Sequence, residues 1–145
     1  MKPTKFAIEA VIWNPENKSE VLGVLRPPND DSLPNVWGLP AVGVKDGELP
    51  EEAIKRMGIE KISTDIRAVS YVGIKQIERA QFELILMDIE AELVGPAPSV
   101  VSATTTGTKY VEQLWVSDFQ IFKEAASKGS LFTRIFLEYQ GMSWE

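Results

Sequence analysis

The sequence predicts a single α/β domain that spans residues 1–145. Three observations lead to this fold class. The chain has 145 residues, which is the size of one domain with a sizeable core. Segments with the apolar pattern of strands surround one charged segment with the pattern of a helix, and further helical patterns close the chain. No repeat or linker-like composition divides the sequence. A layered α/β domain accommodates this order of elements.

The N-terminal part is predicted to form a hairpin, a loop and a short strand. The apolar runs Lys5–Trp13 and Val21–Arg26 flank the turn-type sequence NPENKSE, which favours an antiparallel hairpin. The proline-rich segment Pro27–Asn35 is predicted to be a polar loop. The sequence VWGLPAVG at 36–43 is predicted to be one short strand that leads into a glycine-bearing loop.

The charged segment that follows predicts a helix beginning near Pro50, a residue that suits the first helical position. Leu49 has no side-chain oxygen and is a poor N-cap. Gly58 weakens this helix by about 1 kcal/mol relative to alanine. The buried face is predicted to consist of Ala53, Ile54, Met57 and Gly58.

The second half predicts two long strands, a loop, a further strand and two helices. The second long strand has apolar residues at both alternating sets of positions, so both of its faces are predicted to be covered. Ser117 with Gln120 fits a capping box for the first of the two helices. The predicted elements are strands Ile66–Gln76 and Ala80–Leu93, loop 94–108, strand Lys109–Val116, and helices from Ser117 to about Ser127 and over 130–139.

The composition excludes several classes of site. The chain has no cysteine and no histidine, which rules out disulfides, Cys or His zinc sites, and thiol or Ser-His nucleophiles. Oxygen ligands remain, and they favour magnesium or manganese. The net charge is −6 and no basic cluster stands out, so a long nucleic acid is not an expected partner. No run is long enough for a signal peptide or a membrane span, so a cytoplasmic protein is expected.

The stretch from Trp37 to Ser63 carries a spaced motif. It contains WGLP at Trp37–Pro40, then Glu48 and Arg56 at E-x7-R spacing, then Glu60. This pattern resembles a Nudix box, G-x5-E-x7-R-E-U-x-E-E-x-G-U with U apolar, and the elements before and after it are similar to those of a Nudix domain. The resemblance covers most of the chain. It implies the Nudix fold, in which a mixed β-sheet is sandwiched between helices.

The box is degenerate. On the helical face formed by positions 57, 60 and 61, the residues are Met, Glu and Lys, so one carboxylate remains where the family has three. A second alignment deletes five positions so that Gly58-Ile59 closes the box, but it shortens the helix and loses its glutamates; the ungapped alignment is preferred. The departures from the pattern in that alignment are Val42, Met57, Gly58, Lys61, Ser63 and Thr64.

The resemblance implies roles for the residues that match. Glu60 is the expected catalytic metal ligand, Glu48 a second ligand or an orienting carboxylate, and Arg56 a brace for both. Glu112, on a late strand, is a candidate for the further acidic ligand that many Nudix enzymes supply from outside the box. The expected cofactor is Mg²⁺ or Mn²⁺, weakly bound. The simpler interpretation of Glu52, Arg56 and Glu60 is a surface ion-pair ladder.

Four residues are candidates for substrate binding, and three of them have a simpler interpretation. Lys61 either replaces the charge of a metal and holds a phosphate, or is a solvated lysine near a helix C-terminus. Arg26 either holds a phosphate bidentately or is a surface arginine. Arg79 and Phe82 flank the turn between the two long strands, where Phe82 either stacks on a base or belongs to the core.

The resemblance leaves two functions open. Only the first of them would make the chain an enzyme. The first is a metal-dependent hydrolase, weakened by its missing carboxylates, that cleaves a phosphoanhydride of a nucleoside diphosphate linked to another moiety. The second is a catalytically impaired module that binds such a nucleotide. A prenyl diphosphate isomerase on the same fold is disfavoured, because the related enzymes use a cysteine. A homo-oligomer is also left open.

Overall fold

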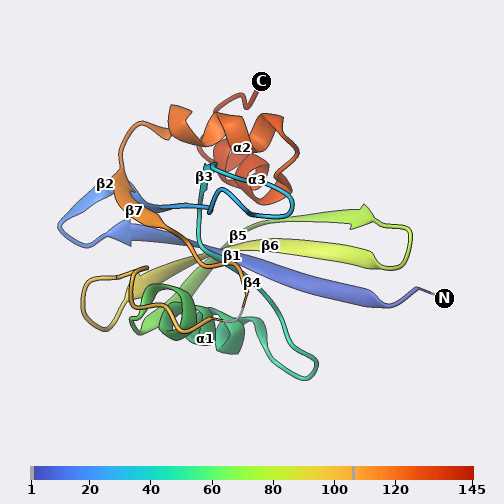
Figure 1. The fold of residues 1–145 in the computed structure, drawn as a ribbon, viewed down its shortest axis with the longest axis horizontal. Coiled ribbons are helices and arrows are strands. Elements are labelled where there is room, and N and C mark those ends of the chain that lie inside the picture. The colour runs from blue at the N-terminus through green and yellow to red at the C-terminus, as the bar shows by residue number, and fades with distance from the viewer. Residues whose placement is uncertain (1, 106) are drawn as a thin grey trace.

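The chain forms a mixed β-sheet between two helical layers. The computed structural model describes residues 2–105 and 107–145; Thr106, in the predicted loop 94–108, lies outside the described residues, as does Met1. Helix α1 (Pro50–Ile62) covers one face of the sheet, and α2 (Lys123–Ser127) and α3 (Leu131–Tyr139) cover the other (Figure 1). This arrangement confirms the predicted α/β fold with a mixed sheet sandwiched between helices.

The sheet has the strand order β3-β2-β1-β6-β5, with β4 pairing with β1 and β7 with β2. Strands β1 and β6 are parallel, and the other pairs are antiparallel. The predicted β1–β2 hairpin and the two long strands are confirmed. The strands are β1 (Thr4–Asn14), β2 (Asn17–Leu25), β3 (Trp37–Gly38), β4 (Ala41–Gly43), β5 (Ile66–Glu78), β6 (Glu83–Leu93) and β7 (Glu112–Val116).

Two predicted elements differ from the structure. The segment 36–43 is two strands, because the chain leaves β2 at Leu39 and crosses to β1, where the Ala10 amide donates to the Pro40 carbonyl at 2.9 Å. The helix predicted from Ser117 is a 3₁₀ turn at Phe119–Phe122 followed by α2. Its N-cap is Asp118, whose carboxylate accepts from the Gln120 amide at 3.1 Å. Local capping preferences alone could not separate Ser117 from Asp118.

Helix α1 begins at Pro50, as predicted, and continues through Gly58 to Ile62. The Glu52 carboxylate accepts from the Leu49 amide at 2.9 Å, so the side chain of Glu52 caps the helix, although Leu49 has no capping group of its own. The helix ends at Ser63, whose φ of 56° is left-handed. A helix that runs to Ile62 has the length that the ungapped alignment requires.

The core lies on both faces of the sheet. One apolar cluster packs between the sheet and α1 and contains Ala53, Ile54 and Met57, all fully buried. The other packs between the sheet and the C-terminal helices and includes Phe122 and Phe136. Because both faces are covered, β6 is buried at both sets of alternating positions, as predicted. Within the described residues, no helix is long and apolar enough to span a membrane.

A pair of buried carboxyl groups joins the parallel strands of the sheet. Glu9 on β1 is in register with Asp88 on β6, and their exposed fractions are 3% and 0%. Glu9 Oε1 and both Asp88 carboxyl oxygens have no hydrogen-bond partner among the described residues. Burial, and then repulsion from Asp88, raises the pKa of Glu9 well above its ordinary value, and burial raises the pKa of Asp88 in the same way. The pair is therefore expected to retain protons that an unfolded chain would release.

This pair predicts a pH dependence of stability. A carboxyl group whose folded pKa is raised contributes most stability below its unfolded pKa of about 4, and that contribution is lost as the pH rises through the folded pKa. The Glu9→Gln variant keeps the shape without the charge. We expect its melting temperature to fall less than that of the wild type between pH 5 and pH 9. The exposed Glu16→Gln variant is the control, and a wild-type slope in Glu9→Gln would contradict the account.

Candidate functional site: the Arg56 network and the Lys61 pocket

Arg56 on α1 joins three parts of the chain. Its guanidinium donates to both carboxylate oxygens of Glu48, with Nε–Oε2 at 2.9 Å and Nη2–Oε1 at 3.0 Å. It also donates to the Gly43 carbonyl oxygen at 2.7 Å and, more weakly, to Glu60 Oε1 at 3.4 Å. The predicted contact of Arg56 with Glu48 and Glu60 is therefore present. The ion-pair ladder interpretation is wrong for Glu52, whose carboxylate caps the helix instead.

Glu48 is held as a charged group in the loop before α1. Besides Arg56, the Lys45 amide donates to Glu48 Oε1 at 3.0 Å. These bonds, with that from Arg56 first, lower the pKa of Glu48 to about 2. Since both carboxylate oxygens accept from these donors, Glu48 is positioned to fix the loop between β4 and α1. Its two oxygens are already engaged by protein donors.

Lys61 does not lie on a solvated helix surface. Its exposed fraction is 7%, and its ammonium lies over the Tyr110 ring, 5.2 Å from the centroid. Burial, followed by repulsion from Arg26 and Arg56, lowers the pKa of Lys61 to about 8, while Glu60 and Asp30 oppose the shift. The interpretation of Lys61 as a solvated lysine is therefore wrong, and the helix end carries a buried cation.

The residues around Lys61 form a pocket of about 380 Å³, here called the Lys61 pocket. It opens between the end of β4, the second half of α1 and the segment before β7. Val42, at the first glycine position of the box, contributes to its wall. It is lined by Val42, Gly43, Lys45, Arg56, Glu60, Lys61, Thr104, Thr105 and Gly107.

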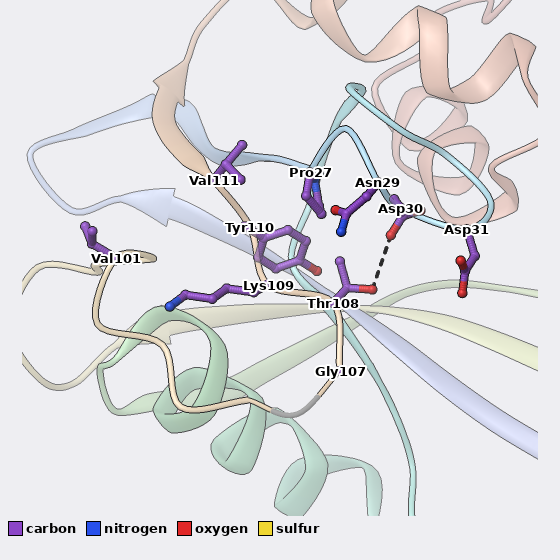
Figure 2. Close-up of a pocket in the computed structure, with 10 residues that line it drawn as sticks. All are labelled: Pro27, Asn29, Asp30, Asp31, Val101, Gly107, Thr108, Lys109, Tyr110 and Val111. Carbon is purple, nitrogen blue, oxygen red and sulfur yellow. Dashed lines mark hydrogen bonds between the residues drawn. The ribbon is translucent and has the colours of Figure 1, made fainter.

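A second pocket of about 810 Å³, here called the loop pocket, lies beside it and shares Gly107. Figure 2 shows Asn29, Asp30 and Asp31 on one side of this pocket, and Lys109 and Val101 on the other. Asp30 is held by Arg26 Nη1 at 3.1 Å, by the Leu33 amide at 2.8 Å and by the Thr108 hydroxyl at 3.4 Å. Arg26 thus organises the predicted loop 27–35.

Tyr110 lines the loop pocket and belongs to the core cluster beneath α1. It is 3% exposed, and its hydroxyl accepts from the Ala41 amide at 2.9 Å. Burial raises the pKa of Tyr110 to about 12, so the phenol is neutral at ordinary pH. Sequence reasoning missed Tyr110, Thr104 and Thr105, because they come from a segment far from the box along the chain. The only available signal was the polar loop that precedes β7.

The structure does not bring all the predicted site residues together. Glu112 is exposed at the start of β7 and lines neither pocket. Arg79 and Phe82 lie in the β5–β6 hairpin, where the Arg79 amide donates to the Phe82 carbonyl and the Lys5 ammonium lies 4.5 Å from the Phe82 ring centroid. The predicted residues that lie close together around the second half of α1 are Arg26, Glu48, Arg56, Glu60 and Lys61.

The donor set fits a protein-built metal cage poorly. Among residues 2–105 and 107–145, no group of three carboxylates is placed to hold a metal ion. Met57, which stands at a metal-ligand position of the box, lies fully buried in the core, and a thioether is a poor ligand for magnesium. Glu60 remains, with 34% of its side chain exposed, and it already contacts Arg56.

The geometry can be compared with solved structures. The chain is similar to the MutT protein from Methanosarcina mazei, with a TM-score of 0.69, 19% identity, and coverage of 97% of this chain and 95% of that chain. It is similar to a Nudix hydrolase from Nitrosomonas europaea, with a TM-score of 0.68, 19% identity, and coverage of 97% and 90%. It is also similar to an ADP-ribose pyrophosphatase from Streptococcus suis, with a TM-score of 0.56, 19% identity, and coverage of 78% and 73%.

No protein-family model and no curated protein matches the sequence. The structural likeness is nevertheless extensive, since it covers nearly the whole chain in the first two cases. The chain has the Nudix hydrolase fold, as the resemblance of its box implied.

Proposed function

We propose that this protein binds the diphosphate group of a nucleoside diphosphate linked to another moiety, with impaired turnover. The observation that carries the proposal is the largely buried side chain of Lys61, a cation that lines a pocket at a box position where the family has a carboxylate. A cation there favours an anionic group, whereas the same position in a catalytic site would help to hold a metal. Lys45 and two threonines also line the Lys61 pocket.

The adjoining loop pocket supports a ligand with two parts. It is larger than the Lys61 pocket, and Asn29 and Asp31 on its wall present hydrogen-bonding groups. The two pockets share Gly107 in their linings, and the proposal places one part of the ligand in each pocket. The proposal uses two of the predicted substrate-binding residues, Lys61 and Arg26. Arg26 orders the wall of the loop pocket through its contact with Asp30. The proposal assigns no role to the other two predicted residues, Arg79 and Phe82.

A second candidate function is slow, metal-dependent hydrolysis of the same phosphoanhydride. The observation in its favour is the retained network in which Arg56 contacts both Glu48 and Glu60. This function needs Mg²⁺ or Mn²⁺, for which Glu60 is the proposed ligand at the pocket. Glu48 would have to give up a bond from Arg56 or Lys45 to join it, and Glu112, which lines neither pocket, has no place in this proposal. With one box carboxylate at the pocket, the activity would be weak.

One experiment separates the two functions. The panel contains ADP-ribose, because one structural neighbour is named for its cleavage, with other nucleoside-diphosphate-linked compounds and nucleoside triphosphates. Product release is followed by ³¹P NMR, and binding by the melting temperature, in magnesium, manganese or chelator. We expect at least one linked compound to raise the melting temperature without product release. If no compound raises it, the binding proposal fails.

The Glu60→Gln variant completes the test. Under the binding proposal, its affinity for the same compound stays within about threefold of the wild type, since the amide keeps the shape of the carboxylate. Metal-dependent product release that is lost in Glu60→Gln but kept in the exposed Glu51→Gln control would establish the hydrolase instead.

A further inference from the structure

Lys61 is a buried cation without a carboxylate partner. Among the described residues, no carboxylate oxygen lies within 4.0 Å of its ammonium; the nearby group is the neutral Tyr110 ring at 5.2 Å. A buried charge is unfavourable unless it is paired, so such a group is expected to have a partner that binds from outside. Lys61 lines the Lys61 pocket, where such a partner can enter.

The carboxylates nearest to Lys61 already form ion pairs with arginines. The Glu60 carboxylate contacts Arg56, and the Asp30 carboxylate contacts Arg26. Arg26 and Arg56 both act on Lys61 as repelling cations. The local field is therefore positive at the position where a catalytic Nudix box concentrates carboxylates.

The pocket wall also offers neutral donors. The Thr105 hydroxyl accepts from the Gly107 amide at 3.1 Å, which leaves its own hydrogen available for an oxygen of a ligand. Thr104 lines the pocket beside it, and Lys45 brings a second ammonium to the rim. The amides of Thr104 and Thr105 both donate to the Glu60 carbonyl, at 2.8 Å and 3.1 Å, so this segment is fixed against α1.

We propose that the Lys61 pocket is a metal-independent anion site that takes a phosphate or diphosphate group, with the Lys61 ammonium in the place of a bound metal ion. Lysine binds phosphate as a point charge, and an ammonium and hydroxyls together satisfy several oxygens. The inference deepens the proposed function, since it assigns how the same pocket would hold the ligand. Binding at this anion site, unlike the proposed function, needs neither a nucleoside nor a divalent cation.

The test uses inorganic pyrophosphate and inorganic phosphate, titrated calorimetrically into the whole protein in buffer with chelator. We expect wild-type protein to bind pyrophosphate without metal, and Lys61→Met to bind it about ten- to a hundredfold more weakly. Methionine fills a buried site of similar length without charge, so this variant is expected to fold at least as well as the wild type. Lys55→Met, an exposed change on the same helix, is the control and should stay within about twofold.

A second measurement needs no variant. Pyrophosphate added to ¹⁵N-labelled wild-type protein in chelator should shift the amide signals of Thr104 and Thr105 more than those of the β5–β6 hairpin. The inference is overturned if Lys61→Met binds as the wild type does, if those amide signals do not move, or if pyrophosphate binds only when magnesium is present. Metal-free binding that is lost in Lys61→Met supports it even if no nucleotide binds, so its failure and that of the proposed function remain distinguishable.

Discussion

The Arg56→Met variant is expected to melt roughly 8 °C below the wild type and to lose most of its ligand-induced stabilisation. Arg56 donates to both oxygens of Glu48, to the Gly43 carbonyl and to Glu60. The paired side chains are only 17% and 14% exposed, so Glu48 would be left as a largely covered, unpaired carboxylate. Loss of one partner of such a pair costs about 2 kcal/mol or more, which corresponds to the expected shift for a chain of this size.

The control for this variant is Arg67→Met. Arg67 on β5 also pairs with a carboxylate, Glu92, but 71% of its side chain is exposed. Exposed pairs contribute little, so this variant is expected to melt within about 2 °C of the wild type. Equal melting temperatures for the two variants, measured by circular dichroism, would contradict the structural role of Arg56.

The Gly58→Ala variant is expected to destabilise the fold by about 2 kcal/mol, although alanine is the better helix former by about 1 kcal/mol. A Cβ atom at Gly58 would lie 2.7 Å from the Thr64 carbonyl oxygen and 2.7 Å from Ile66 Cγ1. The carbonyl belongs to the backbone just after the left-handed C-cap at Ser63, which has little freedom to move. The chain would therefore have to shift α1 away from β5.

Urea unfolding measures this effect directly. Gly43→Ala is the matched control, because a Cβ at Gly43 meets no atom within 4 Å. We expect the midpoint to fall for Gly58→Ala and to stay unchanged for Gly43→Ala. A raised midpoint for Gly58→Ala would mean that helix propensity outweighs the close packing.

The sequence was sufficient to predict those parts of the fold that depend on local patterns. Pro50 marks the start of α1 correctly, and runs of apolar residues locate the two long strands. The split between β3 and β4 was not predictable locally, because each strand pairs with a different neighbour. Glu9 is a charged residue within the apolar run Lys5–Trp13, and only the parallel pairing of β1 with β6 places it against Asp88.

The part of the site that depends on local spacing along the chain was also predictable. The E-x7-R spacing brings Glu48 and Arg56 together across one loop and two helical turns, and the structure has this contact. Tyr110, which reaches Lys61 from a distant segment, contributes to the burial of Lys61, so the helix sequence alone favoured a solvated lysine over a phosphate-binding lysine.

We expect the Lys61 pocket to receive the diphosphate group of the ligand. Chemical-shift mapping tests this on ¹⁵N-labelled protein with a non-hydrolysable methylene analogue of ADP-ribose or of whichever compound binds best. The largest shifts are expected at the amides of Gly43, Lys61, Thr104 and Thr105, with smaller shifts at Asn29 and Asp31 in the loop pocket. Shifts confined to the β5–β6 hairpin around Arg79 and Phe82, with none around Lys61, would contradict it.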